Sequence, residues 1–301
     1  MHVRIPCSLI SPLVRRLASA TSKNPTMTTA TTRLFASKSA SGSGSGSGSD
    51  ILRSFKLKSS NESELEGNDV AGAMESLAKA DAVCFDVDST VIQEEGIDVL
   101  ANSLGKYNVI SELTTQAMTG NVKFEDALQA RLDILQPSRQ NIDDCLVKYP
   151  FKISNGVDTF IKALLHRGTD VYFVSGGFRL MIEPVAKHLN VPISHIYANT
   201  IFFKDDMDGS YAGFDRNEPT SADLGKPKAL THIQSLKNYH TMVMIGDGAT
   251  DAQAKPPAKS FIGFGGVVER QAVKSKACWF VYDFADLNRI VQEHSVNFNQ
   301  S

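Results

Sequence analysis

Four short apolar runs of the chain each end abruptly in Asp or Gly. They are Ala82–Phe85, Val171–Val174, Met242–Ile245 and Phe261–Phe264. Helical stretches separate most of them, and this alternation is typical of buried parallel strands covered by helices on both faces. In such a doubly wound α/β sheet, ligands bind outside the carboxyl ends of the strands. The sequence therefore predicts that the polar residues after the runs meet at one edge of the sheet.

Charge and composition separate a leader from the folded part. Residues 1–49 hold six basic side chains and no Asp or Glu, which leaves residues 50–301 with a net charge of −8. The first 40 residues are rich in Ser, Thr, Ala and Arg, which predicts an organelle transit peptide. Residues 41–49 alternate Ser and Gly, which indicates a flexible linker. We expect residues 1–67 to be disordered and to lie outside the fold.

The leader leaves the destination of the protein open. We favour a chloroplast over a mitochondrion, whereas translation from Met27 would give a cytoplasmic form. A disordered tail without a targeting role is the alternative interpretation.

Several classes of protein are excluded or disfavoured by the sequence. The acidic folded part has no basic stripe, which argues against nucleic acid as a partner. Because no run of about 18 uninterrupted apolar residues occurs, we predict no membrane span. The widely spaced Cys84, Cys145 and Cys278 predict neither a disulfide framework nor a zinc site and suit a reducing compartment. No phosphate-binding GxxxxGK[ST] loop is present, so nucleotide-driven transfer is not supported.

More than 80 residues separate the first two predicted strands, far more than one crossover helix needs. The pattern from Gly96 to Lys148 is helical, with Leu128 and Leu132 spaced by four residues. We therefore expect a helical cap domain of residues 97–150, inserted between the two parts of a Rossmann-like core at residues 68–96 and 151–301.

Three smaller elements are expected in the second half of the chain. Residues 195–216 predict a small β-hairpin around the turn Asp208-Gly209. A helix is expected over Lys228–Leu236, and Cys278–Tyr282 is typical of a last strand followed by a short helix from about Asp283.

Two carboxylates follow the first strand, at Asp86 and Asp88. At this spacing on a turning strand end, both can point into one space. One could attack phosphorus and form an acyl phosphate, while the other donates a proton to the leaving oxygen. The alternative is a pair of solvated turn aspartates.

Further polar groups follow the other strands. The segment Gly246–Asp251 supplies carboxylates that suit Mg²⁺, although Asx turns that close a strand would look the same. Ser175-Gly176-Gly177 offers a hydroxyl and backbone N–H groups that can hold an anion, and Lys226 offers a cation, although SGG is common in turns and a single lysine is commonly solvated. A nucleophile, an acid, a metal site and a phosphate site at one edge predict phosphoryl transfer.

The order DVDST, SGG, lysine and GDGATD resembles the four motifs of the haloacid dehalogenase superfamily. The stretches DVDSTVIQEEGID (Asp86–Asp98), ELTTQAMTG (Glu112–Gly120) and FIGFGG (Phe261–Gly266) resemble the phosphoserine phosphatase family within it. The resemblance implies a small-molecule substrate, O-phospho-L-serine, hydrolysed through an aspartyl-phosphate in the last step of phosphorylated serine biosynthesis. A homodimer is a hypothesis for the assembly.

Carried over residue by residue, the resemblance implies a role for each matching position. Asp86 is the nucleophile and Asp88 the general acid and base. One Mg²⁺ is held by Asp86, Asp247 and the main-chain carbonyl of Asp88. The transferring phosphate is bound by the following four residues: Ser175, Gly176, Gly177 and Lys226.

In the cap region the resemblance implies recognition of an amino acid. Glu95 meets the ammonium group of the substrate and Arg131 its carboxylate, a pairing that suits a zwitterion. The remaining implied site residues either line the pocket or support the site: Met118, Thr119, Thr250 and Arg270.

The chain departs from the family pattern at Thr119 and Leu224, where glycine is usual, and at Gln253, where glutamate is commoner. None of these changes removes a catalytic group, but Thr119 narrows the space beside the substrate. Two alternatives therefore stay open. One is a phosphatase or phosphotransferase acting on another small phosphate ester, and the other is a binding protein without catalysis that senses phosphorylated metabolites.

Overall fold

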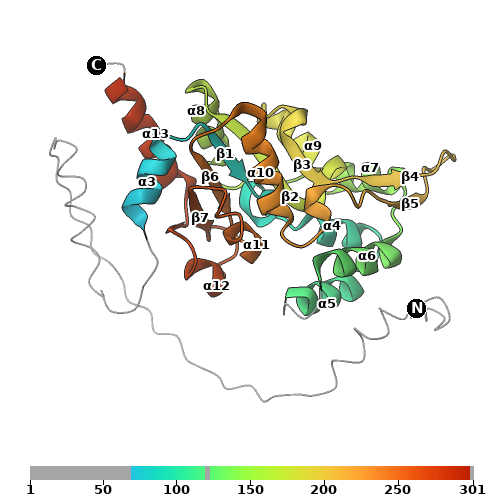
Figure 1. Ribbon diagram of the computed structural model, residues 1–301. Coiled ribbons are helices and arrows are strands. Elements are labelled where there is room, and N and C mark those ends of the chain that lie inside the picture. Colours follow the sequence, from blue (N-terminus) through green and yellow to red (C-terminus); the bar gives the residue numbers. More distant parts are fainter. Residues whose placement is uncertain (1–68, 119–122, 299–301) are drawn as a thin grey trace, which may run out of the picture. The chain divides into compact units, whose positions relative to one another are not determined.

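The core of the protein is a sheet of six parallel strands in the order β3-β2-β1-β6-β7-β8 (Figure 1). The computed structural model describes residues 69–118 and 123–298, with side chains omitted at 116–118 and from 294 onward. The strands are β1 (Ala82–Phe85), β2 (Asp170–Phe178), β3 (Ile196–Asn199), β6 (Met242–Gly246), β7 (Ser260–Phe264) and β8 (Trp279–Val281). The predicted doubly wound α/β class is confirmed, and all four apolar runs are strands.

Alternate residues of each strand face opposite helical layers, because successive side chains of a strand point to opposite faces. In β1, Val83 and Phe85 belong to one apolar core, whereas Ala82 and Cys84 belong to the other. The first core is covered by four helices: α3 (Val70–Ala78), α8 (Val157–His166), α9 (Arg179–His188) and α13 (Phe284–Phe298). The second core is covered by α10 (Gly225–Lys237), which lies on the other side of the sheet from α8 (Figure 1).

Helices occupy almost the whole insertion between β1 and β2. They are α4 (Gly96–Ser103), α5 (Tyr107–Met118), α6 (Phe124–Leu135) and α7 (Arg139–Lys148). Their apolar faces form a third core that includes Leu100, Ile110 and Leu132, together with Phe178 from the end of β2. The insertion therefore packs through a core that it shares with the end of β2 and with residues of the later antiparallel pair, Ile201 and Phe214, apart from the two sheet cores.

The predicted hairpin is wrong in its first part. Ile196–Asn199 forms β3, the edge strand of the parallel sheet, and only β4 (Ile201–Phe203) and β5 (Tyr211–Phe214) pair antiparallel. Ile196 and Ala198 are buried in the first sheet core, so joining the long strand β2 removes more apolar surface from water than a free hairpin would.

Helices at other strand ends are longer than the sequence indicated. Helix α10 begins at Gly225 instead of Lys228, and α13 runs from Phe284 to Phe298. Two one-turn helices, α11 (Ala249–Ala252) and α12 (Gln271–Lys274), follow β6 and β7. Across the described residues, every helix falls short of the length and apolar character that a bilayer crossing requires.

We predict that Phe160→Ala destabilises the fold by about 3–5 kcal/mol, because it empties the centre of the first sheet core. The ring of Phe160 is fully buried, with its centroid 5.9 Å from that of Phe85 and 5.8 Å from that of Phe284. Urea unfolding measures the change. Phe202→Ala serves as the control, since Phe202 is about half-exposed on β4 and its loss should cost about 1 kcal/mol or less. Equal costs for the two variants would contradict this account of the core.

Candidate active site

The first two predicted site residues lie in the turn that leaves β1. Asp86 is extended and its carboxylate accepts a hydrogen bond from the Val87 backbone N–H at 2.8 Å. Ser89 then takes a left-handed conformation (φ +54°), which reverses the chain. Because β1 lies between β2 and β6, this turn stands beside the carboxyl ends of both neighbours. The central place of β1 thus brings Asp86 close to groups from three segments.

A buried lysine joins two of these carboxylates. The Nζ atom of Lys226 lies 2.8 Å from Oδ2 of Asp86 and also contacts Oδ1 of Asp251. Asp251 has no exposed surface and accepts a hydrogen bond from the Gly248 N–H at 2.8 Å. Burial alone would lower the pKa of Lys226, but Asp251 and then Asp86 raise it above its ordinary value. Lys226 therefore stays charged inside the protein.

The start of α10 places this lysine. Leu224 adopts a left-handed conformation (φ +55°, ψ +27°), so the helix begins at Gly225 and Lys226 falls in its first turn. Glycine adopts this conformation without the steric penalty that a side chain adds, which explains why the family pattern favours glycine here. Leu224 is about half-exposed, so its side chain has room at the surface, and only the local backbone penalty of about 1–2 kcal/mol remains. The departure at this position therefore leaves the lysine in place.

Asp247 lies at the end of β6, beside Asp86. Its Oδ1 accepts a hydrogen bond from the Thr90 hydroxyl at 3.2 Å, and its carboxylate forms an ion pair with Arg270. Arg270 also donates to the main-chain oxygen of Asp247 at 3.1 Å and lies 3.6 Å from Oε1 of Glu95. Arg270 thus connects the predicted metal-binding carboxylate to the predicted substrate-binding one.

The donor set at this edge fits a hard cation. Asp86, Asp247 and Asp251 each offer a carboxylate oxygen, and these oxygens lie within 4.8 Å of one another. Magnesium prefers oxygen ligands and uses one or two carboxylates together with water and substrate oxygens. The geometry places Asp251 beside the predicted pair, but its two oxygens already accept hydrogen bonds from Lys226 and from the Gly248 N–H. That the Asp88 carbonyl is a ligand stays a prediction.

The second carboxylate of the turn has a different environment. Burial, followed by the charges of Glu95 and Asp86, raises the pKa of Asp88 to about 8. Its Oδ1 accepts a hydrogen bond from the Gly96 N–H at 2.9 Å. A Cβ atom on Gly177 would lie 2.6 Å from Oδ2 of Asp88, so a larger residue there would require this carboxyl group to shift. At neutral pH Asp88 is largely protonated and can donate a proton.

The Ser175-Gly176-Gly177 segment ends β2, next to Asp88. Ser175 is buried, and its Oγ accepts a hydrogen bond from the Gly177 N–H at 2.9 Å. The Gly176 carbonyl accepts one from the Asn199 side chain at 2.8 Å, which ties the segment to β3. The segment is part of a strand, and α9 starts only at Arg179, so its hydroxyl lies at the sheet edge ahead of the helix.

The two predicted substrate-recognition residues lie in the inserted helices and their approach. Glu95 precedes α4 and accepts a hydrogen bond from the Ser89 hydroxyl at 2.7 Å, while burial raises its pKa. Arg131 lies on α6 and is buried, and it donates to the Ala127 carbonyl at 3.1 Å and to the Thr114 hydroxyl at 3.4 Å. Glu95 lines a cavity of about 610 Å³ beside α4.

Four other positions that the sequence analysis named show no contact with these site residues in the described part of the chain. Thr250 is exposed on α11, and Gln253 is exposed at the C-terminal end of the same helix. The side chain of Met118 and the whole of Thr119 lie outside the described residues.

Sequence reasoning assigned no individual role to Thr90, Asp251 and Thr114, which the geometry brings into contact with predicted site residues. Thr90 and Asp251 stand inside the DVDST and GDGATD motifs, so the motifs themselves carried the signal. Thr114 carries no comparable signal, because only the packing of α5 against α6 brings it to Arg131.

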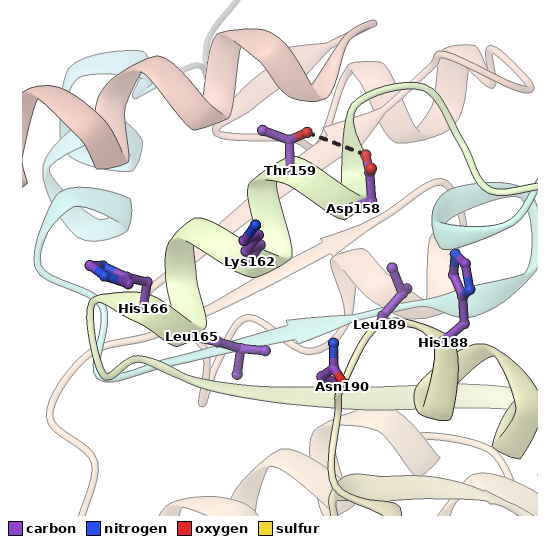
Figure 2. A pocket seen from close by; sticks show the side chains of 8 residues that line it. All are labelled: Asp158, Thr159, Lys162, Leu165, His166, His188, Leu189 and Asn190. Carbon is purple, nitrogen blue, oxygen red and sulfur yellow. Dashed lines mark hydrogen bonds between the residues drawn. The ribbon is translucent and has the colours of Figure 1, made fainter.

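A second cavity of about 610 Å³ lies between α8 and the end of α9 (Figure 2). Lys162, His166 and His188 line it, and none of the predicted site residues does. This second cavity is therefore not part of the candidate active site at the carboxyl edge of the sheet.

The parallel sheet, the turn with two carboxylates and the buried lysine define a haloacid dehalogenase-like hydrolase, and the sequence model of that family matches residues 80–255. A phosphoserine phosphatase of Bos taurus is 46% identical over 214 residues, which cover 71% of this chain and 94% of the relative. A chloroplastic phosphoserine phosphatase of Arabidopsis thaliana is 46% identical over 209 residues, which cover 69% and 70%. The chain belongs to the phosphoserine phosphatase family of these hydrolases.

A solved structure described as a phospho-aspartyl intermediate analogue of phosphoserine phosphatase is similar to the chain. It is 25% identical with a TM-score of 0.60, and the match covers 69% of this chain and 97% of that one. The helices and strands of this chain are therefore arranged in space much as they are in that structure.

We predict that Lys226→Met destabilises the metal-free protein, and more so as the pH rises. Breaking a buried ion pair costs about 3–5 kcal/mol at a pH where the carboxylates are charged. Burial and Asp86 raise the pKa of Asp251 to about 7 although Lys226 lowers it. A carboxyl group with a raised pKa loses its stabilising contribution as the pH rises through that value, and removing Lys226 enlarges the loss.

Urea unfolding in chelator at about pH 5.5 and about pH 8 measures the effect of Lys226→Met. Lys237→Met is the matched control, because Lys237 pairs with Asp170 at 2.8 Å but is half-exposed. Its loss should cost about 1 kcal/mol or less at either pH. A cost for Lys226→Met that is equal at both pH values would show that Lys226 does not hold Asp251 in its charged form.

Proposed function

We propose that the protein hydrolyses O-phospho-L-serine to L-serine and phosphate. The observation that carries the proposal is the pair of carboxyl groups in the turn after β1. Asp86 lies against the charged Lys226, whereas the pKa of Asp88 is raised to about 8. A carboxylate paired with a cation can serve as the nucleophile, and a carboxyl group with a raised pKa can serve as the acid at the same place. The names of the curated relatives supply the substrate.

The reaction proceeds in two steps. In the first, an oxygen of Asp86 attacks phosphorus and forms the aspartyl-phosphate, while protonated Asp88 donates its proton to the leaving serine oxygen. In the second, the Asp88 carboxylate takes a proton from water, which attacks the phosphoryl group and releases phosphate and free Asp86. Each residue ends the cycle in the state in which it began.

The transferring phosphoryl group needs positive and hydrogen-bonding partners. Lys226 already lies within 2.8 Å of Asp86 and so stands beside any group bound to that carboxylate. The Ser175 hydroxyl lies at the neighbouring strand end, with Gly176 and Gly177 beside it, and completes the proposed phosphate site. Donors held in place before the reaction stabilise the charge of the transition state without reorganisation.

The proposed cofactor is a single Mg²⁺ held by Asp86, Asp247 and the main-chain carbonyl of Asp88. When bound, the ion supplies positive charge that lets a carboxylate approach a dianionic phosphate ester. Asp251 and the hydroxyl of Thr90 orient the residues around this position. Arg270 pairs with Asp247 and so limits the electrostatic repulsion among the three carboxylates.

The amino acid part of the substrate is assigned to the inserted helices. Glu95 receives the ammonium group, and Arg131 binds the carboxylate with its planar guanidinium. Met118 and Thr119 line the pocket in this proposal, and Thr250 and Arg270 support the site.

We predict that Asp86→Asn lowers phosphate release from phosphoserine by about 10⁴-fold or more, because the variant lacks the nucleophile. The variant should also form no acid-labile phosphoenzyme. Phosphate release with Mg²⁺ and after chelation, together with acid-quench labelling, measures both effects. Asp126→Asn on α6 is the control, since its carboxylate is exposed and should not affect turnover.

Three outcomes would contradict the proposal. Turnover retained in Asp86→Asn would show that another group is the nucleophile. Unchanged turnover after complete chelation would remove the metal from the proposal. Equal turnover of phosphoserine and a phosphate ester without an amino acid group would favour a phosphatase of a different substrate range.

We further propose that residues 1–67 direct the protein to a chloroplast, as the name of the Arabidopsis relative suggests. A fusion of residues 1–67 to a fluorescent protein should enter chloroplasts in plant cells, whereas a fusion of residues 27–67 should stay in the cytoplasm. The reason is that the second fusion lacks three of the arginines, Arg4, Arg15 and Arg16. Mitochondrial or cytoplasmic fluorescence of the longer fusion would contradict the proposal.

A further inference from the structure

Residues 175–177, which belong to the proposed phosphate site, bulge out of the parallel sheet. Val174 of β2 pairs with Tyr197 of β3, and Phe178 pairs with Asn199, so β2 has two residues more than β3 between these pairs. A bulge takes residues out of the hydrogen-bonded ladder, and their backbone groups then need other partners. The backbone of the proposed phosphate site therefore depends on contacts outside the strand pairing.

The peptide group between Gly176 and Gly177 is held on both sides. Its carbonyl accepts a hydrogen bond from Nδ2 of Asn199 at 2.8 Å, and its N–H donates to Oγ of Ser175 at 2.9 Å. Because the C=O and N–H bonds of a trans peptide point in opposite directions, fixing the carbonyl also fixes the direction of the N–H. Asn199 has no exposed surface, so it holds this peptide from inside the protein.

The orientation of the Asn199 amide is set by Thr220. The buried hydroxyl of Thr220 donates to Oδ1 of Asn199 at 3.1 Å, which leaves Nδ2 to donate to the peptide. Thr220 belongs to a one-turn helix, Pro219–Ser221, that packs closely against the start of α10, since a Cβ atom on Gly225 would lie 2.9 Å from Cα of Thr220. The same turn therefore supports Asn199 on one side and contacts the first residue of α10 on the other.

The direction of the Gly177 N–H decides what the Ser175 hydroxyl can do. While Oγ of Ser175 accepts from this N–H, the hydrogen of the hydroxyl is available to a phosphate oxygen. If the peptide turned over, the Gly176 carbonyl would face Oγ and accept that hydrogen instead. Glycine on both sides of the peptide makes such a turn easy, because no Cβ atom hinders it. A contact that holds the carbonyl away from Ser175 is therefore needed to keep the hydroxyl available.

We propose that Asn199 is a positioning residue that fixes the Gly176–Gly177 peptide and so keeps the Ser175 hydroxyl free to donate to the transferring phosphoryl group. This inference rests on the proposed function and deepens it. Asn199 acts through Ser175 and contributes neither to the nucleophile nor to the acid. Its effect should therefore concern the phosphoryl group alone and be the same for every phosphate ester that the protein hydrolyses.

The variant Asn199→Leu keeps the branched shape of the side chain but removes both of its polar atoms. We expect kcat to fall about 10²-fold, the cost of losing one donor to the transition state. The factor should be the same for phosphoserine and for p-nitrophenyl phosphate, which share only the phosphoryl group. Asn141→Leu is the matched control, because Oδ1 of Asn141 also accepts from a backbone N–H, that of Ser138 at 3.1 Å, but at the start of α7. It should leave kcat unchanged.

A double-mutant cycle separates positioning from a general change of structure. Ser175→Ala lowers kcat by itself, and in that background Asn199→Leu should have almost no further effect, since the hydroxyl that it keeps available is gone. Thr220 gives an independent test. Thr220→Val should lower kcat about threefold, because it removes the hydrogen bond that orients the amide. Thr220→Ser keeps the hydroxyl and should retain kcat close to that of the wild type.

Several results would overturn the positioning role. One is a full effect of Asn199→Leu in the Ser175→Ala background, and another is a loss of kcat for phosphoserine but not for p-nitrophenyl phosphate. If circular dichroism shows that Asn199→Leu does not fold, the Thr220 variants decide, and equal kcat values for Thr220→Val and Thr220→Ser would refute the role.

The proposed function and the positioning role can fail separately. A wild-type protein that prefers another ester would contradict phosphoserine as the substrate, and the same cycle measured with the preferred ester would still test Asn199. Preference for phosphoserine together with unchanged kcat in Asn199→Leu would reject the positioning role alone. A wild-type protein that hydrolyses no phosphate ester in the presence of Mg²⁺ would reject both.

Discussion

The buried cation of Lys226 is the interaction on which the candidate site depends. Asp251 is fully buried, and Asp86 stands beside it at the end of the central strand. Two carboxylates at this distance would repel each other and lose their hydration, which the interior does not tolerate without an opposite charge. Lys226 touches both. The early start of α10 at Gly225 and the left-handed Leu224 are the backbone features that bring it there.

The same sheet edge gives two carboxyl groups, two residues apart, different chemical characters. Asp86 forms an ion pair with Lys226, whereas Asp88 accepts a hydrogen bond from the Gly96 N–H and lies beside Gly177. Burial then raises the pKa of Asp88 to about 8. The division between nucleophile and acid therefore comes from the surroundings of each group and not from its type, since both are aspartates.

The sequence predicted the fold more completely than the contacts of the site. Ala82–Phe85 has the bounds of β1, and the helical pattern from Gly96 to Lys148 has the outer bounds of four helices. The edge strand β3 was not predicted, because an apolar segment followed by a turn has the same sequence pattern as the first strand of a β-hairpin. The contact of Thr114 with Arg131 had no sequence signal, since it depends on how two helices pack.

The sequence by itself determined the parallel α/β class, the edge at which polar residues gather and the residue types available there. Apolar runs that end in Asp or Gly suffice for this, because hydrophobic periodicity and strand direction are local properties. Only the tertiary structure decided that Asp251 joins Asp86 and Asp247, and that Arg270 links Asp247 to Glu95. These pairings arise from burial and charge compensation between segments far apart in the chain, and the spacing of residues along the sequence does not encode them.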